Sequence, residues 1–161
     1  CVTVEFMSDK APAFDTIYPE LMVSAGEIDL TQTDCNVVGC GMGFSAKARK
    51  RLEDAIASPV PLIVDADALR MIADDVTLQD KLLARKAHTV ITPHPGEAAA
   101  IIHSTVEKVQ ADRIGAAREL AVQTGAISIL KGAGSVVTLR SSPGSTRRAT
   151  RCSPPPARAT S

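Results

Sequence analysis

Aromatic residues are scarce in this sequence, which has no Trp, one Tyr and three Phe among 161 residues. Hydrophobic residues nevertheless make up 45% of the chain, so its core must be built mainly from Ala, Val, Ile and Leu. Aliphatic cores of this kind are typical of sheets whose strands run parallel. The length allows one domain with a sizeable core.

Long apolar runs and metal-binding cysteine patterns are absent as well. No run approaches the roughly 18 apolar residues that a membrane span requires, and no signal-peptide pattern is evident. The four cysteines show neither a CxxC pair nor a Cys/His ligand spacing; they are Cys1, Cys35, Cys40 and Cys152. We therefore expect free thiols in a reducing compartment, hence a cytoplasmic protein with no membrane partner.

Acidic residues are missing from the C-terminal part of the chain. The net charge is zero overall, but it is −5 over residues 1–139 and +5 over residues 140–161. The basic segment also contains three consecutive prolines and no periodic apolar face, which predicts a disordered tail after a folded domain at 1–139. No nucleic-acid recognition motif accompanies the tail and the folded part is acidic, so nucleic acid is not an expected partner.

Short β-branched runs alternate with helical patterns along the chain. Strands are expected at residues 1–6, 19–23, 36–38, 61–64, 89–92, 126–130 and 136–139, and helices at about 45–58, 68–74, 77–86, 97 onwards and 106–124. Gly115 lies inside the last helix and indicates close packing there. Residues 136–139 are the expected hairpin partner of 126–130. The alternation predicts an α/β fold with a mainly parallel sheet flanked by helices.

The most informative stretch is the turn at residues 93–97, Pro-His-Pro-Gly-Glu. It lies between a short β-branched run and an alanine-rich helical run, at the carboxyl end of a predicted strand. Open α/β sheets bind ligands there, and the free N–H groups of a helix start favour anions. His94 and Glu97 are its titratable side chains. The alternative is a rigid turn in which Glu97 only complements the helix dipole.

Three other loops follow predicted strands. Glycines at residues 39–43 let backbone amides approach a phosphate or a flat ring, unless they form only a tight turn. Asp65 and Asp67 suit Mg²⁺ or a ribose, although Asp67 would also serve as a helix cap. The Lys, glycines and hydroxyl of residues 131–135 suit phosphates. All four loops are expected at one edge of one sheet.

Four segments in this order resemble the NAD(P)H-hydrate dehydratase family: VVGCGMG, PLIVDADAL, VITPHPGEAA and DRIGAARELA…ISILKGAGSVV. The resemblance covers about residues 1–138 and implies a ribokinase-like fold. It also implies a lyase that removes water from hydrated NADH or NADPH with ADP or ATP as co-substrate. The alternatives are a vitamin kinase of the same superfamily, which carries Asn in place of His94, and a non-catalytic nucleotide-binding remnant.

The resemblance further implies a role for individual residues. Gly41 and His94 contact the hydrated dinucleotide, and Asp65 and Asp67 belong to the same substrate site. Glu97 acts with Mg²⁺, the implied metal, to neutralise phosphate charge. The adenine nucleotide is held by five consecutive residues, Lys131, Gly132, Ala133, Gly134 and Ser135. The preference for ADP or ATP stays open, and so does the oligomeric state, a homo-oligomer included.

The chain departs from the family pattern in two places. The family's domain begins before Cys1, with a strand and a helix that also touch substrate. The Gly-Ser-Gly-Asp motif, whose Asp is the expected catalytic base, does not follow the hairpin, so the catalytic residue is unassigned. Residues 150–161 can be encoded by codons that, regrouped one base earlier, read Asn-Pro-Leu-Leu-Ala-Thr-Ala-Gly-Ser-Gly-Asp-Val. We interpret the chain as truncated at its N-terminus, out of frame from about 137–143, and inactive as written.

Overall fold

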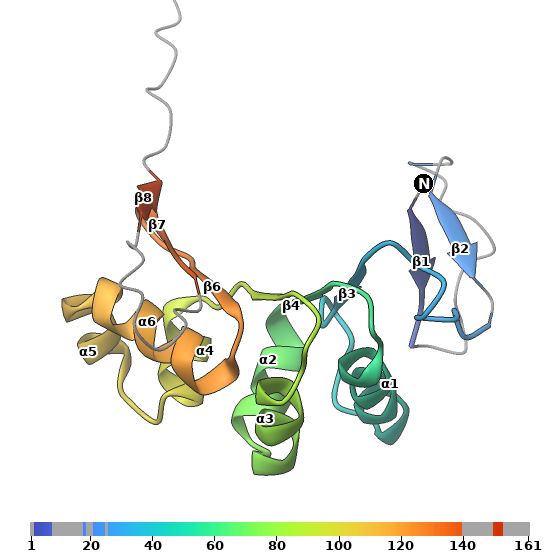
Figure 1. Cartoon of the computed structure of the whole chain (residues 1–161), viewed down its shortest axis with the longest axis horizontal. Coiled ribbons are helices and arrows are strands. Elements are labelled where there is room, and N and C mark those ends of the chain that lie inside the picture. Colours follow the sequence, from blue (N-terminus) through green and yellow to red (C-terminus); the bar gives the residue numbers. More distant parts are fainter. Residues whose placement is uncertain (1, 8–17, 19–20, 25, 140–149, 153–161) are drawn as a thin grey trace, which may run out of the picture.

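The computed structural model describes residues 2–7, 18, 21–24, 26–139 and 150–152 (Figure 1). A small parallel sheet pairs β1 (Thr3–Glu5) with β2 (Met22–Ser24). The main sheet has six strands in sequence order, namely β3 (Asn36–Val38), β4 (Leu62–Val64), β5 (Thr89–Ile91), β6 (Ile127–Leu130), β7 (Ser135–Thr138) and β8 (Thr150–Cys152).

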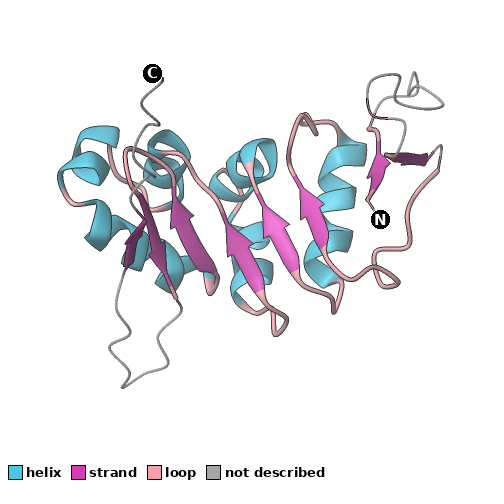
Figure 2. Cartoon of the chain, turned by 90° about the horizontal axis from the view of Figure 1, so that it is seen from above, coloured by secondary structure: helices cyan, strands magenta, loops and turns pink. Residues whose placement is uncertain are grey.

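The first four strands of the main sheet run parallel, and β7 and β8 are antiparallel additions. The described helices lie on one face of this sheet (Figure 2); they are α1 (Ala46–Ala57), α2 (Ala66–Ala73), α3 (Val76–Leu83), α4 (Pro95–Ile101), α5 (Val106–Ala111) and α6 (Arg113–Thr124). The predicted α/β class with a mainly parallel sheet is confirmed. The ends of β3 to β6 meet at one edge, called the carboxyl edge below.

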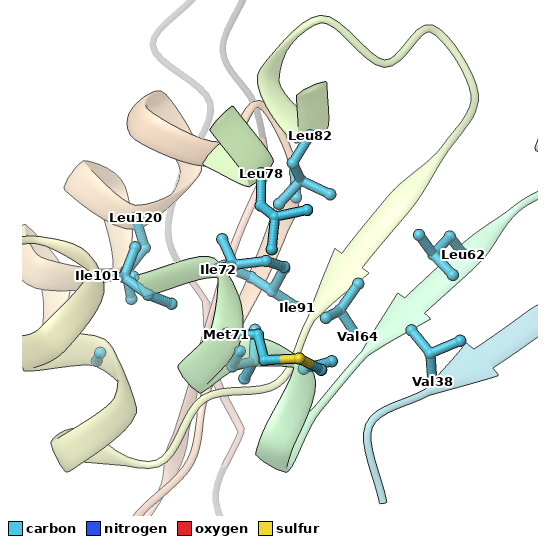
Figure 3. Close-up of a cluster of buried hydrophobic side chains, with 14 of the residues drawn as sticks. Val38, Leu62, Val64, Met71, Ile72, Leu78, Leu82, Ile91, Ile101 and Leu120 are labelled. Carbon is cyan, nitrogen blue, oxygen red and sulfur yellow. The ribbon is translucent and has the colours of Figure 1, made fainter. Parts of the chain in front are cut away.

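The core lies between the sheet and its helices. Alternate strand residues such as Val38, Val64 and Ile91 point toward the helices and are buried (Figure 3). The helices supply fully buried aliphatic side chains, among them Leu52, Leu69, Ile72, Leu78, Leu82, Ile101 and Leu120. Each such side chain contributes roughly 1.5–3 kcal/mol by burial. The expected aliphatic core is present, and no described helix is both long and apolar enough to cross a membrane.

The opposite face of the sheet carries a row of apolar side chains that no described helix covers. Val37, Ile63, Val90 and Ile127 are partners in register across four strands. None of the four is buried, and Val37 is 62% exposed. Parallel sheets normally have both faces covered, so this row is a surface with a tendency to associate.

Lysine substitutions at two neighbouring positions of β3 distinguish its faces. Val37→Lys places a charge in water, so we expect weaker binding of an apolar dye and a free energy of unfolding within about 0.5 kcal/mol of the original. Val38→Lys buries an unpaired charge and should cost about 3 kcal/mol or more. Urea denaturation and dye fluorescence measure both effects. Equal destabilisation by the two variants would contradict the exposed face.

The helix predicted over residues 106–124 is in fact two helices. Asp112 ends α5 and caps α6, with φ −134 and ψ 77, and its Oδ1 accepts a hydrogen bond of 2.8 Å from the N–H of Gly115. A Cβ at Gly115 would lie 2.1 Å from Oδ2 of Asp112, which confirms close packing there. The single-helix prediction was wrong. The apolar spacing continues across Asp112, but the Asp112 side chain is a strong N-cap and starts a new helix there.

Three residues of the predicted tail pair with the main sheet. Residues 150–152 form β8 and pair with β7, with Val136 opposite Arg151. The free N–H and C=O groups of an edge strand recruit a neighbouring segment in this way, without needing an apolar face. The disorder predicted for residues 140–161 stays a prediction. Residues 140–149 and 153–161, Cys1 and the first part of the strand predicted at 19–23 lie outside the described residues.

Candidate functional site

The four candidate loops meet at the carboxyl edge. The backbone N–H of Gly43 donates to Oδ2 of Asp67 at 2.8 Å, which joins the loop after β3 to the start of α2. Lys131 donates through Nζ to Oδ1 of Asp65 at 2.6 Å and through its backbone N–H to the carbonyl of Pro93 at 2.9 Å. The loops after β4, β5 and β6 are thereby joined, as the sequence predicted.

The glycine turn, residues 39–43, needs its glycines for two different reasons. Gly39 has φ +116, and a Cβ there would lie 1.8 Å from the carbonyl oxygen of Asp65, so only glycine allows the two loops to approach. Gly41 has φ +64, but a Cβ there would meet nothing within 4 Å. Among the described residues, the space into which a Gly41 side chain would project is therefore open, which suits a position that contacts a ligand.

The two aspartates after β4 have different structural roles. Asp65 caps α2, because its Oδ1 accepts from the N–H of Ala66 at 2.8 Å. Asp67 lies in the first turn of α2 and holds the glycine turn, so the alternative in which Asp67 is the cap is wrong. Ala66 between them has φ +48, a left-handed conformation that costs Ala about 1–2 kcal/mol. Strain of this kind is concentrated at functional sites.

The Asp65–Lys131 ion pair is accessible from solvent. Burial raises the pKa of Asp65, but hydrogen bonds from Lys131 and from the N–H of Ala66 lower it more, so the pKa lies below its usual value. Asp65 is therefore ionised at neutral pH and partly neutralises Lys131. The Lys131 side chain is 44% exposed, so a phosphate has room to compete for it.

The turn at residues 93–97 is locked by a reciprocal capping box. Nδ1 of His94 accepts from the N–H groups of Gly96 and Glu97 at 2.9 and 3.3 Å, and Oε2 of Glu97 accepts from the N–H of His94 at 2.9 Å. A neutral imidazole that accepts at Nδ1 carries its proton on Nε2, which lies 3.2 Å from Oε1 of Glu97. Glu97 is buried, but the His94 ring is 57% exposed, so His94 is the accessible group of this turn.

A cavity of about 290 Å³ lies beside His94, between α2 and α4. It is lined by Arg70, Ala73, Asp74, His94, Gly96, Glu97 and Ala100. The Arg70 guanidinium also lies 5.9 Å from the ring centre of Phe44, an exposed aromatic side chain at the end of the glycine turn. The sequence interpretation missed Arg70 and Phe44, although both directly adjoin segments it had singled out.

The described residues do not fit a metal held by protein ligands alone. They contain no group of three or more His, Cys, Asp or Glu arranged to bind one. The carboxylates of Asp65, Asp67 and Glu97 are each engaged, with Lys131, Gly43 and His94 respectively. A cation whose main ligands are phosphates and waters needs few protein ligands, and only that kind of site is compatible with this edge.

The lysine loop, residues 131–135, suits an anionic ligand better. It turns on Gly132 and Gly134, which have φ +150 and +74. Gly132 and Ala133 are exposed, so their main chain is accessible. Lys131 begins the loop at the end of β6. A cation followed by a glycine-rich main chain is a phosphate-binding arrangement.

Relatives of known sequence match this chain over most of its length. A bifunctional NAD(P)H-hydrate repair enzyme of Escherichia coli is 38% identical over 141 residues, which is 84% of this chain and 26% of the relative. An ADP-dependent (S)-NAD(P)H-hydrate dehydratase of Neisseria meningitidis is 37% identical over 120 residues, 71% of this chain and 40% of the relative. The chain thus spans between a quarter and two fifths of these proteins.

Solved structures share the fold at lower identity. An ADP/ATP-dependent NAD(P)H-hydrate dehydratase of Bacillus subtilis, crystallised with ATP and Mg²⁺, has a TM-score of 0.63 and 23% identity over 77% of this chain and 44% of its own. A ribokinase-like superfamily protein of Enterococcus faecalis has a TM-score of 0.63 and 21% identity over 85% of this chain and 49% of its own.

The family model described as NAD(P)H-hydrate dehydratase matches residues 1–149. This range includes every loop of the carboxyl edge. The predicted ribokinase-like fold and the predicted family are both confirmed by these matches. The chain belongs to the NAD(P)H-hydrate dehydratase family.

Proposed function

We propose that the carboxyl edge binds hydrated NADH or NADPH beside an adenine nucleotide, in an enzyme that restores the dinucleotide by nucleotide-dependent dehydration. The observation that carries this proposal is the junction of the four loops through Lys131, Asp65 and Asp67. It brings the glycine turn, an exposed imidazole and a glycine-rich loop that begins with a lysine to one edge. The names of the relatives from Escherichia coli and Neisseria meningitidis support it.

The substrate half comprises the glycine turn, the aspartates after β4 and His94. The space on the Cβ side of Gly41 is open among the described residues, which suits contact between its backbone and a flat ring. Nε2 of the exposed His94 ring lies 3.2 Å from Oε1 of Glu97, and an Nε2–H can donate a hydrogen bond to a ligand oxygen. Asp67 fixes Gly43, so its part is to shape the turn. Asp65 suits a ribose hydroxyl, because a carboxylate accepts hydrogen bonds.

The nucleotide half comprises Lys131, Gly132, Ala133, Gly134 and Ser135. Lys131 would exchange Asp65 for a phosphate, and the accessible main chain of the loop would donate N–H groups to the phosphate oxygens. Mg²⁺ bound with the nucleotide would neutralise phosphate charge, and Glu97 remains the proposed protein contact of that cation. The Glu97 carboxylate already accepts a hydrogen bond from the N–H of His94, which supports an indirect contact between Glu97 and the cation.

The chemistry requires positioning more than covalent participation by the protein. The hydrate hydroxyl attacks the terminal phosphorus, the bond from phosphorus to the nucleotide breaks, and the hydroxyl proton passes to a base. The carbon–oxygen bond then breaks, phosphate leaves, a proton is lost from the neighbouring ring carbon and the ring double bond re-forms. The two halves of the edge would hold the hydroxyl and the phosphorus in line.

We also propose a cytoplasmic location, with no nucleic-acid or membrane partner. Cys35 and Cys40 are exposed free thiols, which supports a reducing compartment. Residues 1–139, which carry the whole edge, are the proposed partial ribokinase-like domain. The net charge of −5 over these residues does not favour binding to nucleic acid.

Calorimetric titration of the folded chain with hydrated NADPH tests the proposal. We expect saturable binding that is weakened about tenfold by His94→Ala, since a hydrogen bond to a ligand contributes about 1–1.5 kcal/mol. The matched control is His88→Ala, because His88 is exposed at the amino end of the same strand, β5. Absence of binding at millimolar hydrated NADPH, with circular dichroism showing a folded chain, would refute the proposal.

A further inference from the structure

We propose that Arg113 is a positioning residue for the lysine loop, which orients the N–H groups of the loop toward the phosphates of the nucleotide. The inference rests on the proposed function and goes beyond it by assigning a residue outside the four loops. Arg113 is the first residue of α6 and lies 17 or more positions before the residues it contacts. The contacts of Arg113 with the loop therefore form only when the chain folds.

The Arg113 guanidinium donates to four carbonyl oxygens in and beside the loop. Its two terminal nitrogens divide these acceptors between them. One donates to Ala133 and Gly134, both at 2.9 Å, and the other to Leu130 and Lys131, both at 3.2 Å. Nearly every peptide group of the loop is therefore fixed from one side by a single side chain.

The orientation of the N–H groups follows from the planarity of the peptide bond. The described residues contain no cis peptide, and in a trans peptide the N–H points opposite to the C=O of the preceding residue. The carbonyls of Lys131 and Ala133 point toward Arg113, so the N–H groups of Gly132 and Gly134 point away from it. Gly132 is exposed on the surface, so this second side is accessible to an anion.

Gly132 is the position that allows Arg113 to come so close. A Cβ at Gly132 would lie 2.7 Å from a terminal nitrogen of Arg113 and 3.0 Å from its central carbon. Gly132 also has φ +150, a conformation that side chains rarely adopt. The first glycine of the loop therefore serves the contact with Arg113 as well as the turn itself.

The charge of Arg113 is not neutralised by an acid within the part of the chain that the structure describes. Its acceptors are carbonyl oxygens, whereas the buried Arg51 pairs with the carboxylate of Glu5. A cation behind the loop and N–H dipoles in front of it both favour an anionic ligand. The arrangement is that expected for a phosphate and not for a cationic group.

Arg85 provides a matched control. It is buried and donates to the carbonyl oxygens of Ala55 and Ile56 at 3.1 and 2.6 Å, at the end of α1. It also donates to the side-chain oxygen of Thr89 at 2.9 Å, at the start of β5. Arg85 thus fixes carbonyls with the same chemistry, but at the amino ends of the strands.

The test compares Arg113→Lys with Arg85→Lys in the full chain, because a single ammonium cannot hold four carbonyls as the planar guanidinium does. We expect Arg113→Lys to weaken ADP binding at least tenfold in calorimetry, while hydrated NADPH binding changes less than twofold. Arg85→Lys should lower the urea midpoint and leave ADP binding within twofold. In ligand-free NMR spectra, Arg113→Lys should shift the amide resonances of Gly132 and Gly134.

Unchanged ADP binding and unchanged amide resonances in folded Arg113→Lys would overturn the inference. So would an equal loss of ADP binding in Arg85→Lys, because the effect would then be one of general stability. If Arg113→Lys does not fold, Arg113→Gln is measured by the same criteria. If the original chain binds hydrated NADPH and not ADP, the nucleotide half of the proposed function fails and this inference falls with it. If the chain binds both and Arg113→Lys has no effect, only this inference fails.

Discussion

The 161-residue chain is expected to turn over hydrated NADH or NADPH at far less than about 1 s⁻¹, with either ADP or ATP. The phosphorylation step needs a base to take the hydroxyl proton, and the Gly-Ser-Gly-Asp motif that the family resemblance assigns to this step does not occur in the sequence. A general base typically contributes about 10²- to 10⁴-fold to a rate. A chain assayed without that base is therefore expected to turn over slowly.

The three carboxylates that the sequence placed at the carboxyl edge are each engaged in the ligand-free chain. Asp65 is paired with Lys131, Asp67 accepts from Gly43, and Glu97 accepts from the backbone of His94. The pKa of Asp65 lies below its usual value, which makes its carboxylate a weaker proton acceptor. Binding and catalysis are thus separable in this chain.

The assay for this prediction follows the return of dihydronicotinamide absorbance after nucleotide and Mg²⁺ are added. Replacing residues 150–161 with Asn-Pro-Leu-Leu-Ala-Thr-Ala-Gly-Ser-Gly-Asp-Val should raise the rate by about 10²-fold or more over a control that carries Asn in place of the Asp. Turnover of the original chain at about 1 s⁻¹ or faster would show that both the frameshift interpretation and the assigned base are wrong.

The second large effect concerns Lys131. We expect Lys131→Ala to weaken ADP binding at least tenfold, because charge-assisted hydrogen bonds contribute about 1.5–3 kcal/mol each. The same substitution leaves the carboxylate of Asp65 unpaired beside the phosphates, which adds repulsion. Lys108→Ala is the matched control, since Lys108 is exposed on α5. Its ADP affinity should match that of the original chain.

Asp65→Asn tests whether Asp65 competes with a phosphate for Lys131. Asp65 and a phosphate compete for the same ammonium group, held at 2.6 Å by Oδ1 in the ligand-free chain. Removing the carboxylate charge should therefore tighten ADP binding, while Lys131→Ala weakens it. Calorimetry of both variants measures whether the affinity for ADP rises or falls. If both weakened ADP binding equally, the ion pair itself would be the functional unit, contrary to this account.

The sequence was a good guide wherever the signal was local. The β-branched runs at β3, β4, β5 and β6 and the loops that follow them predicted the sheet and its carboxyl edge. The predicted helix from 45 to 58 agrees closely with α1, whose cap is Ser45. Parallel topology then required the loops to meet, because strands in this order end at one edge.

The sequence was a poor guide to contacts between distant residues. The Asp65–Lys131 pair joins residues 66 positions apart, and Arg113 reaches carbonyls whose positions depend on the fold. The break at Asp112 was, by contrast, visible in principle. Asp is a favoured N-cap residue, but the apolar periodicity on both sides of Asp112 predicts one continuous helix.

The most direct test of the central claim is an NMR titration of the chain labelled on glycine. The claim is that two ligands bind side by side at one sheet edge. Hydrated NADPH should shift the amide resonances of Gly41 and Gly43, and ADP should shift those of Gly132 and Gly134. Gly125, at the end of α6 away from that edge, should respond to neither. Shifts at Gly125 alone, or one set of glycines responding to both ligands, would contradict the account.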